Sequence, residues 1–554
     1  MPIASVPATE PRIGQAAARS VQFHKRKPSA MRRILDGKEI QALARLVEES
    51  TRSTREGVKY FIEPAPGTLQ RAKNKRHHII FGRRGSGKSS LLAKVTEDLT
   101  ISRSPIAYVD LEDFKGHSYP DVLLSVLITA LSEFKKWLET AAINPSTKKS
   151  FWAKFFGSKP RRGGFNRLKT KEIATELGSL LDELNQTLFS SDEQKQQVSL
   201  KLETGTELQT AISSQFGTTG IKAGSKLAGK EKDFAAHEAK SEYVSKKIEL
   251  LQRNIMRYKS IFKRMAELAE GPAFLLLDDL YHIRLQDQAQ VLDYFHRVAK
   301  GSNLWIKVGT IRHRSRWYVF GDPPRGMKLG DDAEEIDLDV TLEKYDLTKR
   351  FLLQILDNFA RKVKIQLDEF LTDGARDRLV LASGGVARDF LTIFRRAIDV
   401  ARERIASGGT SRGEKIGTED VNRAGGENDK FKREDFSRDA GKDEQRKLLD
   451  SFERANDFCL NRARANCFLI DKDFTGEDAS NIAELVDLKF LHHVQSRVTI
   501  RDRVHRLYDA YMLDLSQYAG ERARRNFDMI EFWGQGAEDS LRKSRLIFLE
   551  RANV

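Results

Sequence analysis

The segment Gly82-Arg83-Arg84-Gly85-Ser86-Gly87-Lys88-Ser89 carries the strongest chemical signal in the chain. It matches the pattern G-x-x-x-x-G-K-[ST], with a short apolar run before it and a helical pattern after it. Glycines let backbone N–H groups approach phosphate oxygens closely, and the helix adds its positive end. The lysine can hold the β- and γ-phosphates, and the serine hydroxyl can ligate Mg²⁺. We predict that ATP and Mg²⁺ bind at Gly82, Arg84, Gly85, Ser86, Gly87, Lys88, Ser89 and Ser90.

Two adjacent carboxylates follow another apolar run. The segment FLLLDD at residues 274–279 ends in Asp278 and Asp279. A strand of this kind places Asp278 at the carboxyl edge of a sheet, where it can hold Mg²⁺ through water. Asp279 is then positioned to polarise a water molecule against the γ-phosphate, as a general base. We predict that Lys88, Asp278 and Asp279 are catalytic, and that hydrolysis is slow because Asp279 is one methylene shorter than glutamate.

The run LWIKVGTIR at residues 304–312 predicts a further strand that ends in Thr310 and Arg312. A polar or cationic group at this tip can contact the γ-phosphate, and we expect Arg312 to sense it. Arg314 and Arg316 follow in the sequence. They are interpreted either as a finger that reaches an adjacent subunit or as part of an ordinary basic loop.

A fourth candidate lies in the segment LASGGVARDFLTIFRRA at residues 381–397. Gly384 and Gly385 permit a tight break, and a new helix is expected to begin near Val386. Arg388 would then lie in the first turn of that helix, where the helix dipole disfavours a cation. A phosphate group nearby would explain this position, although an ordinary surface arginine would fit the same pattern.

The elements that position these residues alternate between strand and helix. The all-apolar run before Asp278 is typical of a parallel strand that is covered on both faces. We therefore predict an α/β fold with a parallel sheet. The expected strands lie at 77–82, 106–113, 274–280 and 304–312, and the expected helices at 88–99, 122–141 and 286–301.

Composition favours a cytoplasmic protein with an anionic partner. Lys and Arg number 95 against 79 Asp and Glu, which gives a net charge of +16 over 554 residues. The two cysteines, Cys459 and Cys467, are too few for a disulfide framework or a four-cysteine zinc site, and they suggest a reducing compartment. No run of about 18 apolar residues predicts a membrane-spanning helix, and the N-terminus lacks the apolar core of a secretory signal.

Residues 142–255 interrupt the alternation and are predicted to be a long, mostly helical insertion, with helices at 169–188 and 235–269 and a hairpin at 199–212. The stretch from Lys148 to Lys171 holds nine basic residues and no acidic one, interleaved with Phe and Trp. This composition suits nucleic acid, through stacking and phosphate contacts, and less strongly an anionic membrane surface. A loop whose aromatic residues pack on the body of the protein is the third interpretation.

The phosphate loop, the run ending in Asp278, the strand ending near Arg312 and the segment SGGVARDFL occur in an order that resembles AAA+ and STAND-type P-loop ATPases. The chain is most similar to the origin-recognition-complex-like branch, which includes bacterial members of uncharacterised or defence-associated role. The resemblance implies that Arg388 is a second sensor in a helical lid. It also implies a C-terminal winged-helix domain, which residues 445–554 fit with helix, strand, helix and a wing at 492–503.

These expectations divide the chain into five parts. They are a flexible basic arm at 1–35, a P-loop ATPase core at 36–340 with the insertion inside it, a helical lid at 341–405, a linker at 406–444 and a winged-helix-like domain at 445–554.

The function predicted from the sequence is that of an ATP-dependent switch. It would bind and slowly hydrolyse ATP, bind DNA, and assemble into homo-oligomers or recruit an effector protein. The alternative is a signalling scaffold that acts through protein partners without nucleic acid. A third possibility is an assembly factor that is locked by nucleotide and has no turnover.

Overall fold

The computed structural model describes residues 34–51, 61–143, 165–189, 224–409, 413–439, 442–518, 527–534 and 537–551. The predicted arm up to residue 33, the stretch 148–164 of the basic insertion and the predicted hairpin at 199–212 lie outside these residues. No helix within the described ranges is long and apolar enough to cross a membrane.

A five-stranded parallel sheet forms the centre of the N-terminal half, which confirms the predicted α/β class. Its strand order is β2-β3-β4-β1-β7, and every neighbouring pair is parallel. All six residues of β3 are buried, as its apolar sequence predicts. The strands are β1(His78–Phe81), β2(Ile106–Asp110), β3(Ala273–Asp278), β4(Leu304–Thr310) and β7(Glu334–Asp337).

Helices pack around this sheet and join its strands. Helix α3 begins at Lys88, directly after the phosphate loop, and packs against β2, β3 and β4. The helices of this region are α2(Thr68–Lys73), α3(Lys88–Ile101), α4(Asp121–Ile143) and α7(Leu285–Ala299). Short elements follow three strands at the carboxyl edge of the sheet. They are η3(Leu111–Phe114) after β2, η5(Leu280–His282) after β3, and η6(Arg312–Arg314) with the hairpin of β5(Tyr318–Val319) and β6(Arg325–Gly326) after β4.

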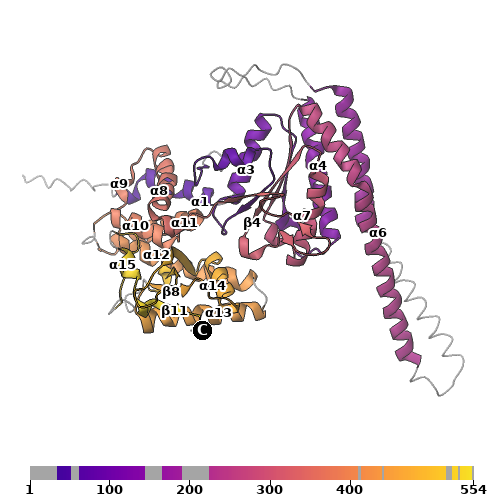
Figure 1. Ribbon diagram of the computed structural model, residues 1–554. Helices are drawn as coiled ribbons and strands as arrows, with labels where there is room; N and C mark the ends of the chain where they lie inside the picture. The colour runs from indigo at the N-terminus through magenta and orange to yellow at the C-terminus, as the bar shows by residue number, and fades with distance from the viewer. Residues whose placement is uncertain are drawn as a thin grey trace, which may run out of the picture.

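The insertion contains two long helices, as predicted. One spans residues 167–189, and the other, α6(Gly224–Ala269), runs past the sheet and away from the rest of the molecule (Figure 1). Ion pairs join them: Arg257 lies 3.2 Å from Glu183, and Arg264 lies 3.1 Å from Glu172. The ion pairs add to apolar packing, which holds the two helices together, since both contribute buried residues to one hydrophobic cluster.

A region of helices follows the sheet where a helical lid is predicted, and it extends beyond the predicted bounds; we call it the lid. It consists of η7(Leu342–Lys344), α8(Tyr345–Lys362), α9(Leu367–Phe370), α10(Asp373–Ala382), α11(Ala387–Ala406) and α12(Thr418–Asp439). The prediction of a linker over 406–444 is wrong where α12 lies. Its polar, Gly-containing sequence suggested a loop, but Val421 and Ala424 are fully buried and α12 packs against α10 and α11.

A C-terminal unit follows the lid, with the predicted order of helix, strand, helix and antiparallel hairpin. Its four-stranded sheet has the order β11-β8-β10-β9. The pair β9 and β10 forms the hairpin, and the loop of the wing covers 499–507, later than the predicted 492–503. The elements are α13(Lys442–Asp457), the π-helical turn η9(Phe458–Ala463), β8(Cys467–Asp471), α14(Glu477–Asp487), β9(Leu491–Val498), β10(Tyr508–Leu513), η10(Leu515–Gln517), α15(Ala537–Leu541), η12(Ser544–Leu546) and β11(Ile547–Leu549).

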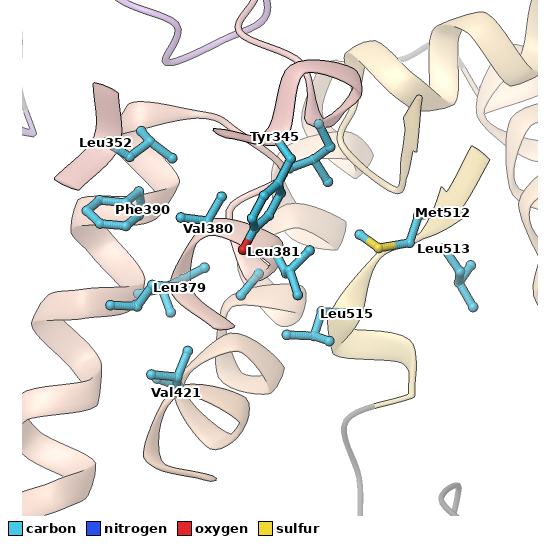
Figure 2. Close-up of a cluster of buried hydrophobic side chains, with 14 of the residues drawn as sticks. Tyr345, Leu352, Leu379, Val380, Leu381, Phe390, Val421, Met512, Leu513 and Leu515 are labelled. Carbon is cyan, nitrogen blue, oxygen red and sulfur yellow. The ribbon is translucent and has the colours of Figure 1, made fainter. Parts of the chain in front are cut away.

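Two separate hydrophobic clusters hold the described chain together. The first surrounds the five-stranded sheet and includes the insertion helices. The second is shared by the lid and the C-terminal unit: Tyr345 and Leu381 of the lid lie beside Met512 and Leu515 of the C-terminal unit (Figure 2). Leu35 of η1(Ile34–Asp36) and the buried face of α1(Lys38–Ser50) also belong to this second cluster. The predicted core at 36–340 therefore begins with a helix that packs with the lid, and the predicted arm ends in a buried residue.

Candidate functional site

The loop between β1 and α3 has the backbone that its glycines predict. Gly85 and Gly87 have φ values of 91° and 100°, a left-handed conformation that side chains rarely adopt. At Gly82 an added Cβ would lie 2.3 Å from Ser86 Oγ. That hydroxyl is buried and has no hydrogen-bond partner among the residues that the structure describes. Such an orphaned polar group fits a site that takes up a polar ligand.

Lys88 is held inside this loop. Its side chain is 4% exposed, and Nζ donates to the backbone oxygens of Gly82 at 2.9 Å and Arg83 at 3.3 Å. Burial lowers the pKa of Lys88, and the nearby carboxylates of Asp279 and Asp278 oppose this shift. Lys88 therefore lies close to two carboxylates, an arrangement that suits a triphosphate bound with a divalent metal.

The two aspartates after β3 have different surroundings. Asp279 lines the pocket beside Lys88 and has a left-handed backbone, with φ of 54°. Burial and the charge of Asp278 raise the pKa of Asp279 to about 6. Asp278 is 1% exposed, and its carboxylate accepts from the hydroxyl of Tyr108 at 2.8 Å and from the backbone N–H of Asp279 at 2.9 Å. Asp279 is thus the carboxylate that faces the pocket, and Asp278 lies behind it.

One pocket brings most of the predicted residues together. The lining includes the loop residues from Arg84 to Ser90, with Asp279 and Arg388, whereas Gly82 and Asp278 are not part of it. Glu112, Tyr281 and His282 also line it and were not predicted. The remaining lining residues are largely apolar, and the sequence analysis missed them entirely. We call this set the apolar end of the pocket: Phe61, Ile62, Pro64, Leu338, Phe351, Ile355, Phe359, Ala387 and Leu391, with Ser50 and Thr51 at the end of α1.

Arg388 lies where the sequence predicts it, in the first turn of α11. It lines the pocket, and its backbone N–H donates to the oxygen of Gly85 in the phosphate loop at 3.3 Å. Arg83 strengthens the same junction, because its guanidinium donates to Gly384 O at 3.1 Å and Val340 O at 3.3 Å. The lid and the phosphate loop are therefore in direct contact beside the pocket.

Arg312 does not line this pocket, whereas its predicted role as a sensor requires it to reach the γ-phosphate. Its guanidinium pairs with Glu335 and lies 3.7 Å from Asp337, both on β7, and it lies over the ring of Phe81 at 4.0 Å. These partners turn the side chain toward the edge strand. Thr310 is also engaged, in a hydrogen bond with Ser315.

The two finger candidates lie apart from the pocket as well. Arg314 is 3.8 Å from Glu484 of α14, whereas Arg316 has an exposed side chain. Neither observation tests a contact with an adjacent subunit.

The residues around the phosphate loop offer enough oxygen ligands for a magnesium ion only when phosphate supplies the others. No cluster of three or more His, Cys, Asp or Glu residues that could hold a metal is present in the described parts of the chain. The candidate protein oxygens are the hydroxyl of Ser89, which lines the pocket, and the carboxylates of Asp278 and Asp279. Mg²⁺ commonly keeps several waters and takes few protein ligands beside substrate phosphates, so this sparse donor set suits it.

No family model matches the chain, and no curated protein matches it. Among solved structures, it is similar to the Aeropyrum pernix Orc1 protein in complex with DNA, with 14% identity, a TM-score of 0.31, and coverage of 88% of this chain and 91% of that chain. It is also similar to Cdc6p from Pyrobaculum aerophilum, with 12% identity, a TM-score of 0.28, and coverage of 79% and 85%. Likenesses at this level assign neither a family nor a function to the chain.

Proposed function

We propose that the protein is an ATPase of the AAA+ type, close to the origin-recognition-complex-like branch, which binds ATP in the pocket between the sheet and the lid. The proposal depends on one observation. Lys88, Asp279 and Arg388 come from three separate segments and line one pocket, together with the phosphate loop and the apolar end. The loop and the two cations suit the phosphates, and the apolar end suits a base.

The residues would have distinct roles in the reaction. Lys88 and the N–H groups of the loop would hold the β- and γ-phosphates, and Arg388 would contact the γ-phosphate from the lid. Asp279 would accept a proton from the attacking water, for which its raised pKa of about 6 is suitable. Because its side chain is short, hydrolysis would be slow, as befits a switch.

Magnesium would be held by Ser89 directly and by Asp278 through water. When bound, the ion would neutralise charge that develops on the phosphate oxygens. Tyr108 would orient Asp278 through its 2.8 Å hydrogen bond.

The test is the substitution Lys88→Ala, measured by titration calorimetry with ATP and Mg²⁺. We expect binding to weaken by at least about 100-fold, since a buried charge-assisted contact to phosphate is lost. Lys94→Ala is the matched control, because Lys94 lies on the same helix and pairs with Glu97 and Asp98 away from the pocket. Tight ATP binding by the Lys88 variant would exclude this site.

DNA is the partner that we propose for the C-terminal unit. The wing between β9 and β10 exposes Arg501 and Arg503, and the chain carries a net charge of +16. Such a loop can contact the phosphate backbone, and its affinity then falls as salt rises. Replacing both arginines with Gln should weaken duplex binding and reduce the salt slope by about two. Arg361→Gln, an exposed arginine on α8, is the control.

A scaffold without nucleic acid is the alternative, and the long helix α6 gives it some support as an arm for a homo-oligomer or an effector protein. Particle mass and phosphate release, measured with ATP and then with ATP and duplex DNA, separate the two. Assembly with ATP and no response to DNA at low salt would favour the scaffold.

A further inference from the structure

The segment around Arg388 is contacted from two sides, by the phosphate loop and by the C-terminal unit. Residues 383–386 join α10 to α11, whose first turn contains Arg388, and the phosphate loop contacts one side of this junction. Arg83 donates to Gly384 O at 3.1 Å, and an added Cβ on Gly85 would lie only 2.8 Å from Arg388 Cβ. Backbone and side chain are therefore packed together with no spare room on this side.

The C-terminal unit holds the other side of the turn. Gly384 has φ of 56°, and an added Cβ there would lie 2.0 Å from Cε1 of His492 on β9. His492 is 1% exposed, and its Nε2 lies 2.9 Å from Asp514. Lys432 of α12 lies 2.6 Å from the same carboxylate. The buried carboxylate of Asp514 thus holds the imidazole in place, and the edge of the ring packs against Gly384.

A second contact reaches the residue next to Arg388. Lys489, directly before β9, donates to both oxygens of Asp389, at 3.1 and 3.0 Å. The two side chains are only 13% and 11% exposed. Breaking a shielded pair by removing one partner leaves an uncompensated charge, so this contact constrains the first turn of α11 strongly.

We propose that Lys489 and His492 are positioning residues that hold Arg388 in the pocket, so that docking of the C-terminal unit sets the preference of the site for ATP over ADP. The inference rests on the proposed function and deepens it. Arg388 can contact a γ-phosphate only when one is present. A displaced Arg388 therefore weakens the binding of ATP and leaves the binding of ADP almost unchanged.

The same contacts couple the docking of the C-terminal unit to the binding of ATP. If docking of the C-terminal unit favours ATP, then ATP favours docking by the same factor. A ligand that pulls this unit away from the turn would lower the affinity for ATP selectively.

The experiment compares Lys489→Met with the unaltered chain by calorimetry, using ATP and ADP with Mg²⁺. We expect ATP affinity to fall by about tenfold and ADP affinity by less than about twofold. Lys447→Met is the matched control, since Lys447 makes an exposed pair with Glu477 on the same unit. In an Arg388→Ala background, Lys489→Met should have no further effect on ATP. Equal losses for ATP and ADP, or a full effect without Arg388, would overturn the proposal.

A second pair of variants tests the other contact and guards against misfolding. Gly384→Ala should lower the preference for ATP, because its Cβ would displace the turn from His492. His492→Ala alone should lower this preference as well, because the edge that packs against Gly384 is removed. A full preference for ATP in a His492→Ala variant that melts normally would count against His492. If the unaltered chain binds neither nucleotide, the proposed function fails, whereas equal ATP preference in every variant defeats only this inference.

Discussion

The sheet region and the region formed by the lid and the C-terminal unit are each held by their own apolar core, but different contacts join them. Inside each region the buried residues are mostly aliphatic and aromatic. Across the boundary lie hydrogen bonds and ion pairs, such as Arg83 with Gly384 and Arg314 with Glu484. Consecutive residues divide between the two cores, since Phe61 packs against the first and Ile62 against the second. A ligand bound in a pocket at this boundary can change how the two regions are positioned relative to each other without disturbing either core.

The largest expected effect comes from opening a cavity in one core at a time. Phe394 in the lid and Phe134 in the sheet region are both fully buried. Replacing either with Ala should destabilise its own region by about 3–5 kcal/mol. Hydrogen exchange followed by mass spectrometry would show which segments lose protection. Equal loss of protection in both regions from either variant would mean that the two cores unfold as one.

Nucleotide should act on both regions, because their residues share the pocket. At about 100 times the dissociation constant, a ligand stabilises the state that binds it by about 2.7 kcal/mol. We expect ATP with Mg²⁺ to slow exchange in the phosphate loop and in α8 alike. Lys88→Ala should abolish the protection at both places. Protection confined to the loop would show that the lid does not close on the ligand.

Acid should weaken the sheet region through two buried histidines. Burial lowers the pKa of His77 and of His78 to about 3, from the usual value near 6.5. His77 Nδ1 accepts the backbone N–H of Ile306 at 3.0 Å, a bond that protonation of this nitrogen would break. The folded state binds fewer protons than the unfolded state between these pH values, so stability is full above about pH 6.5 and falls on acidification.

At pH 5 each of these histidines should cost about 2 kcal/mol relative to neutral pH. His77→Asn keeps an acceptor near the same place and removes one titrating group. Urea unfolding from pH 7 to pH 5 should therefore show a shallower loss of stability in this variant. His117→Asn, at an exposed position, is the control. An unchanged pH slope in the His77 variant would show that this histidine is not the source.

The parts that could be predicted from the sequence are those whose signal is local. The phosphate loop is one contiguous motif, and the buried strands are continuous apolar runs, as in β3. Strand β7 escaped prediction because its sequence EEID is mostly acidic. The pairing of Arg312 with Glu335 was missed as well, because no local pattern in the sequence shows that these two side chains meet.

Features that depend on tertiary packing could not be predicted from local sequence patterns. Helix α12 contains Gly425 and Gly426 and a polar sequence, so its intrinsic helix preference is low. Burial of Val421, in a helix that packs against α10 and α11, stabilises it instead. The apolar end of the pocket joins Phe61 to Ile355 of α8, which lie far apart in the chain. Helical periodicity marks such residues only as apolar, and no pattern shows that they face a ligand.

The smallest effect should come from the apolar end of the pocket, where each region supplies one wall. Phe61→Ala and Ile355→Ala should each weaken nucleotide binding by about tenfold, or ~1.4 kcal/mol, through lost apolar contact. The loss should be equal for ATP and ADP, because the two ligands share the same base, and this distinguishes these variants from Lys489→Met. Leu347→Ala, an exposed residue of α8, is the control. If only Phe61→Ala weakens binding, the base contacts the sheet region alone, and the lid meets the nucleotide solely through its phosphates.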